Sequence, residues 1–170
     1  MPPLTIAQIL AALVTALQTW SANQQIGATI TLARDPYHVL EILAASPQGF
    51  RIVVHWAGDK NISEIDALPL AENRLEIILS YNLGLTAQPD LALIQGPQNR
   101  PSVLDQVDAL RGFVLGIRYP AGQTGTYAVY AGAKSFTTPA GVPLAAYILT
   151  FKLKAAINTV FPTPIPTPIV

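Results

Sequence analysis

The sequence has two histidines, His38 and His55, and these are the first candidates for acid–base chemistry. A hydrolytic triad would pair one of them with a nucleophilic serine and an acid. No G-x-S-x-G motif is present, and no acid stands at a telling spacing from either histidine. We therefore interpret His55 as a strand residue beside Trp56, near a sheet edge or a contact surface, and predict that the protein is not an enzyme.

Two other segments resemble ligand-binding loops but lack residues that such loops need. Residues 59–64 are similar to a calcium loop, but Glu64 stands where the turn needs glycine and Leu70 where the closing glutamate belongs. Residues 132–135 (GAKS) are similar to the end of a phosphate loop, but alanine separates the glycine from the lysine and no helix is expected to follow. Cysteine is absent from the sequence. We expect no metal site and no cofactor.

The composition instead draws attention to surfaces. Hydrophobic residues make up 51% of the 170 residues and charged residues 12%, where a typical globular chain has roughly 25% charged residues. So few charges suggest a surface partly covered by other protein, and therefore an oligomer. The net charge is zero and no run of Lys or Arg is present, which argues against sequence-specific nucleic-acid binding. We expect an intracellular, soluble protein with no membrane partner, because no apolar run reaches the ~18 residues of a membrane span.

Apolar residues at helical spacing, together with capping residues, predict three helices. The first covers residues 5–20 with Thr5 as a plausible N-cap. The second begins at Pro36 after the N-cap Asp35, and the third begins after the N-cap Ser102. The third helix should bury a stripe formed by Val103, Val107, Leu110 and Val114.

Alternating or β-branched residues predict four strands, at residues 50–56, 72–85, 126–138 and 143–157. The polar residues 57–72 are predicted to form a connection, and residues 23–33 fit either a short strand or an extended linker. The predicted element order is α-α-β-β-α-β-β. We expect a single α+β domain over residues 1–160, with an antiparallel sheet packed against helices.

Several of these segments together resemble the tail terminator, or tail-completion, proteins of long-tailed bacteriophages. The resemblance rests on RIVVHWAGDKNISEIDALPLAENRLEIILSYNLGLTAQPD, then the helix SVLDQVDALRGFVLGI and the strand AAYILTFKLKAAI, preceded by two helices. It spans most of residues 4–157. Alternative interpretations are another phage neck, tail or baseplate component, or an unrelated intracellular α+β binding module.

The resemblance implies a structural role in the virion. Proteins of this family are small α+β subunits, made in the host cytoplasm, that assemble into a ring, usually a hexamer. The ring caps the tail tube and offers a docking face to the head-side connector. The implied partners are further copies of the chain, the tail tube and the head–tail connector proteins, and DNA passes through the ring. The family implies no catalytic residues.

Two sets of residues are candidates for contacts in such a ring. Glu64, Asp66 and Glu72 cluster in one segment and are candidates for lining the lumen. Loops at residues 57–71 and 86–100 are candidates for contacts with tube or connector proteins. Residues 161–170, FPTPIPTPIV, fit either a frayed terminus or an extended, semi-rigid Pro-rich arm. In an arm that lies across a neighbouring subunit, Ile165, Ile169 and Val170 would make the subunit contact.

Overall fold

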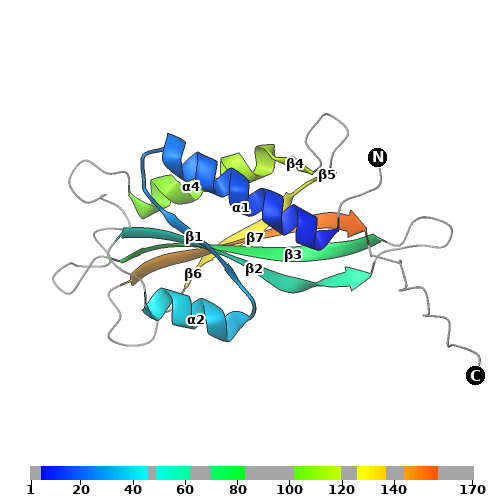
Figure 1. Cartoon of the computed structure of the whole chain (residues 1–170), viewed down its shortest axis with the longest axis horizontal. Helices are drawn as coiled ribbons and strands as arrows, with labels where there is room; N and C mark the ends of the chain where they lie inside the picture. The colour runs from blue at the N-terminus through cyan, green and yellow to red at the C-terminus, as the bar shows by residue number, and fades with distance from the viewer. Residues whose placement is uncertain are drawn as a thin grey trace, which may run out of the picture.

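A five-stranded mixed sheet with helices on both faces forms the body of the protein (Figure 1). The computed structural model describes residues 5–45, 49–61, 70–82, 102–119, 126–136 and 144–156. The helices within these residues are α1 (Ile6–Asn23), α2 (Pro36–Ala44) and α4 (Val103–Gly116). The large sheet has the strand order β1-β2-β3-β7-β6. Its strands are β1 (Thr29–Ala33), β2 (Gly49–Asn61), β3 (Leu70–Asn82), β6 (Val129–Ser135) and β7 (Leu144–Ala156).

The predicted α+β class is confirmed, but the predicted element order and the all-antiparallel sheet are wrong. Residues 29–33 form strand β1, so the order begins α-β-α rather than α-α. β1 is parallel to β2, with Thr29 opposite Arg51 and Ala33 opposite His55. Helix α2 connects the two strands, because a parallel pair needs a crossover connection that a tight hairpin cannot supply. A separate two-stranded ribbon pairs β4 (Arg118–Tyr119) with β5 (Thr126–Tyr127).

The long hairpin β2–β3 extends further than the sequence pattern predicts. The expected connection at residues 57–72 contains the end of β2 and the start of β3, with Lys60 paired to Glu72. These polar residues stay in the sheet because ladder hydrogen bonds use the backbone, and their side chains remain partly solvated. A bulge separates Trp56 from Asp59, and Gly58 within it has a φ of 101°. Glycine adopts this φ without the strain that a side chain would add.

The three predicted N-caps are confirmed. Thr5 and Ser102 each form a capping box, in which the hydroxyl accepts a hydrogen bond from the backbone N–H three residues later. Asp35 accepts a hydrogen bond of 2.8 Å from the N–H of His38. Local side-chain chemistry therefore fixes where each helix begins.

The main core lies between one face of the sheet and the helices α1 and α4, which Figure 1 shows on the same side. The predicted stripe of α4 is buried there. The apolar faces of β3 and β7 are buried there too, and they include Ile77, Leu149 and Phe151. This confirms the alternation assigned to both strands.

The opposite face of the sheet carries a smaller core under α2, formed mainly by Val39, Ile42, Leu43, Val53 and Ile78. Helix α2 has nine residues, so it is about 13 Å long. Strand β3 has 13 residues and spans about 43 Å. Since α2 is the helix that packs on this face among the described elements, part of the face extends beyond it (Figure 1). Polar side chains occupy that part.

Candidate functional site

Three polar side chains are linked on the α2 face of the sheet. His55 on β2 and Glu76 on β3 are direct cross-strand partners. His55 Nδ1 lies 3.4 Å from Glu76 Oε2, a long contact for a hydrogen bond. Arg74 Nη2 donates to Glu76 Oε1 at 2.9 Å. The Glu76 carboxylate therefore contacts both the buried imidazole of His55 and the half-exposed guanidinium of Arg74.

The alternation of the strands places these residues on the face opposite the main core. His55 follows Val53 on the same face of β2, and Glu76 precedes Ile78 on β3. Val53 and Ile78 lie beneath α2, whereas His55 and Glu76 lie near its N-terminal end, beside Pro36. Burial therefore decreases along the strands from Ile78 to Arg74, whose side chain is 52% exposed.

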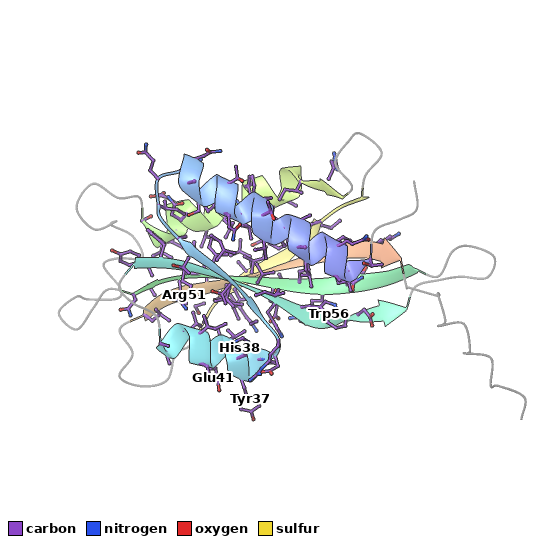
Figure 2. The ribbon with its side chains drawn as sticks, viewed as in Figure 1. Tyr37, His38, Glu41, Arg51 and Trp56 are labelled. Carbon is purple, nitrogen blue, oxygen red and sulfur yellow. The ribbon has the colours of Figure 1, made fainter. Side chains whose placement is uncertain are left out.

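The two histidines have different environments. His55 lies on β2 opposite Ala33, the last residue of the outer strand β1, so it is one strand in from the edge of the sheet; its predicted place near a contact surface stays a prediction. His55 is buried but lines two surface depressions. His38 lies on α2, where its Nδ1 accepts a hydrogen bond from the N–H of Arg34 at 3.2 Å (Figure 2). This bond ties His38 to the turn before its own helix.

We call the two adjoining depressions the α2 groove, because both lie beside the start of that helix. The larger has a volume of about 500 Å³ and the smaller about 160 Å³, and both are lined by Pro36, His55 and Glu76. The larger is also lined by Arg34, Asp35, Trp56, Ala57, Gly58 and Arg74. The smaller is otherwise apolar, with Val39, Leu40, Ile78, Phe136 and Ile148. The α2 groove therefore has a charged half and an apolar half.

The charges of the charged half are paired within it. Arg34 Nε lies 3.2 Å from Asp35 Oδ2, just as Arg74 contacts Glu76. The backbone hydrogen bond from His38 lowers the pKa of Asp35, and the Arg34 guanidinium lowers it further. Asp35 is therefore ionised at neutral pH. Two cations and two anions leave this half without a strong preference for a charged ligand.

The residues that we predicted to make ring contacts are mostly outside the described residues. This is true of Glu64, Asp66, Ile165, Ile169 and Val170, and of the predicted contact loop at residues 86–100. Glu72 is described: it lies on β3 and pairs with Lys152 through a 3.0 Å contact between Oε1 and Nζ. This lysine offsets the negative charge that a lumen-lining role would use.

Sequence reasoning missed the α2 groove. Its lining comes from the turn before α2, from α2 itself and from the strands β2, β3 and β7, together with Phe136. The parallel pair β1–β2 brings the turn at Arg34 and Asp35 close to His55, and the sequence pattern did not predict that pair. The available signal was Glu76, a charged residue between the apolar residues Leu75 and Ile77 of a strand.

Within the described residues, no three His, Asp or Glu side chains gather closely enough to hold a metal ion. None of the described helices combines the length and the apolar character needed to cross a membrane. No protein-family model matches the chain, and the search of curated proteins gives no match.

Proposed function

We propose that the protein is a structural virion subunit of the tail-terminator type, which forms a ring that caps a phage tail tube and joins it to the head-side connector. The observation that carries this proposal is the exposure of apolar side chains on both outer strands of the sheet. The resemblance in size and in the elements of residues 4–157 adds to it.

Within the described residues, the two outer strands carry few of the charged side chains that usually protect an exposed sheet edge. Leu32 on β1 is 46% exposed and Val129 on β6 is 56% exposed. β1 contains no charged residue, and Lys134 is the one charge on β6. Outer strands of monomeric proteins usually carry charges, prolines or a covering element, because an apolar edge invites association. Both edges therefore suit contact with another chain.

A ring makes use of two such edges at once. β1 and β6 lie at opposite ends of the strand order, so they form two different surfaces on one subunit. Contact between different surfaces of successive subunits is heterologous, and it gives a ring when the rotation closes. A charged content of only 12% is easier to tolerate when neighbouring subunits cover these surfaces.

Native mass spectrometry and electron microscopy test the ring directly. We expect a closed ring of about six copies. Leu32→Lys and Val129→Lys should each shift the population toward monomers while the circular dichroism spectrum stays unchanged. Leu104→Lys is the matched control, because Leu104 is similarly exposed, at 39%, but lies on α4. A stable monomer for the unmodified chain would contradict the proposal.

The position of the ring in a tail needs a separate test. The purified ring should bind one end of tubes assembled from the tail-tube protein of the same phage, visible in electron micrographs. Genes for tail-tube and head-connector proteins should lie beside the gene for this chain. Rings that bind along the side of the tube, or not at all, would favour another neck or baseplate component.

The α2 groove favours a second candidate, an intracellular binding module for an extended peptide. A module of this kind would act as a monomer and bind its ligand without forming a ring. The oligomeric state of the unmodified chain separates the two functions.

A further inference from the structure

The α2 groove and residues 161–170 have complementary chemistry. We propose that the groove of one copy receives residues 161–170 of an adjacent copy. This inference rests on the proposed ring, because the ring supplies the adjacent copy.

The apolar half of the groove matches the size of one side chain from this segment. Its volume is about 160 Å³, and an apolar cavity of about 150 Å³ holds a benzene-sized molecule. An isoleucine side chain or a prolyl ring is of comparable size. The segment offers Ile165, between Pro164 and Pro166, and Ile169 after Pro168. Filling the apolar half with one of them would remove Leu40, now 38% exposed, from water.

The charged half matches the backbone of the segment. Four of its ten residues are proline, and proline has a carbonyl acceptor but no N–H donor. The partly exposed guanidinium groups of Arg34 and Arg74 each have five N–H donors, more than their contacts with Asp35 and Glu76 use.

The absence of charge in residues 161–170 also fits the groove. The cations of the charged half are already paired with the anions of the same half, so an occupant with its own charge would leave that charge uncompensated. An uncharged segment rich in carbonyl groups avoids this cost. The balanced charges of this half therefore give no preference for an acidic or a basic peptide over an uncharged one.

The direction of β7 favours an adjacent copy over the chain's own groove. β7 runs alongside the groove, from Ile148 at the apolar half to Lys152, which is opposite Arg74 of the charged half, and it ends at Ala156, four residues further (156 − 152). At ~3.3 Å per residue, this carries the chain about 13 Å beyond the charged half, in the direction that leads away from the apolar half. To reach the apolar half of its own groove, the chain would have to reverse direction after Ala156, and the fixed φ of four prolines in residues 161–170 disfavours such a reversal.

The test uses full-length protein in which the segment is disabled by the double substitution Ile165→Asp and Ile169→Asp, here the arm variant. A synthetic peptide of residues 161–170 should bind the arm variant saturably in isothermal titration calorimetry. Adding Leu40→Arg should weaken binding at least about tenfold. Adding Leu104→Arg, a control on α4 with similar exposure, should leave binding unchanged. Absence of binding, or equal binding after Leu40→Arg, would overturn the proposal.

A mixing experiment identifies which copy supplies the segment. The arm variant and a Leu40→Arg groove variant should each assemble poorly alone, whereas their mixture should form mixed oligomers in native mass spectrometry, because each supplies what the other lacks. A mixture that stays unassociated while the peptide binds would overturn the assignment to an adjacent copy. The two proposals fail differently: rings without peptide binding overturn the occupant of the groove but not the ring, and peptide binding by a chain that never associates overturns the ring and the adjacent copy but not the groove as a site for this segment.

Discussion

Glu76 bridges His55 and Arg74, with Oε2 3.4 Å from the imidazole and Oε1 2.9 Å from the guanidinium. The two partners differ in burial: the side chain of His55 is 7% exposed and that of Arg74 is 52% exposed. Losing a partner costs more at a buried polar group than at a solvated one, because water replaces the missing partner at the surface. The two contacts of Glu76 should therefore contribute unequally to stability.

Glu76→Ala should lower the free energy of unfolding by about 1–3 kcal/mol, because it leaves the buried imidazole without its partner. Arg74→Ala should lower it by less than about 1 kcal/mol, since an exposed ion pair contributes little. Urea denaturation measures both, with Glu41→Ala on the exposed side of α2 as a control (Figure 2). Equal effects for Glu76→Ala and Arg74→Ala would contradict this ranking.

Stability should depend on Asp35 at acidic pH. Its pKa in the folded protein is lowered below the ordinary value of 3.8, first by the backbone hydrogen bond from His38. The folded state therefore favours the ionised carboxylate, and the resulting stability is fully present above pH 3.8. It is lost as the pH falls through the lower, folded pKa.

The comparison with Asp35→Asn isolates this contribution, because asparagine also caps helices but carries no titrating group. The difference in free energy of unfolding between the two proteins should stay constant from about pH 7 to about pH 5 and change in favour of Asp35→Asn below pH 3.8. Denaturation curves across this range measure it. A difference that does not change with pH would show that the carboxylate charge is not involved.

The capping box of α4 should contribute measurably to stability. Ser102 Oγ accepts from the N–H of Asp105 at 3.1 Å, and the Asp105 carboxylate accepts from the N–H of Ser102 at 3.1 Å. Ser102→Ala should cost about 0.5–2 kcal/mol, whereas Ser102→Thr keeps a capping hydroxyl and should cost less. Thermal or urea denaturation distinguishes them. If threonine is as costly as alanine, the hydroxyl is not the source of the effect.

The elements that sequence reasoning predicted well are those with strong local signals. Asp35 before Pro36 marks the start of α2, and the buried positions of α4 recur at helical spacing. Strand β7 shows clean alternation from Leu149 to Leu153. In each case the residues that determine the element lie within it or beside its end.

The elements that were missed depend on partners distant in sequence. β1 has only five residues, and Gln25 and Gly27 before it both have positive φ, a local conformation equally suited to a linker. What makes residues 29–33 a strand is the parallel pairing with β2, some twenty residues later. The α2 groove was missed for the same reason, because its walls come from segments that only the complete sheet brings together.

The Arg51 side chain, which comes from the sheet, places a positive charge at the C-terminal end of α2. The last turn of α2 contains no basic residue, and Arg51 Nη1 on β2 donates to the carbonyl of Ile42 at 3.2 Å. The last carbonyl groups of a helix have no partner within it, and they carry its partial negative charge. This one contact therefore helps to hold the C-terminal end of α2 against the sheet (Figure 2).

Arg51→Met keeps much of the apolar stem but removes the guanidinium. We expect a loss of about 1–3 kcal/mol, combining a charge-assisted hydrogen bond with the helix-dipole interaction. Amide hydrogen exchange should rise more in α2 than in α4, because the contact acts locally. Lys134→Met, which removes an exposed cation on β6, is the control and should change neither helix. Equal acceleration in α2 and α4 after Arg51→Met would mean that the substitution weakens the whole fold rather than the attachment of α2.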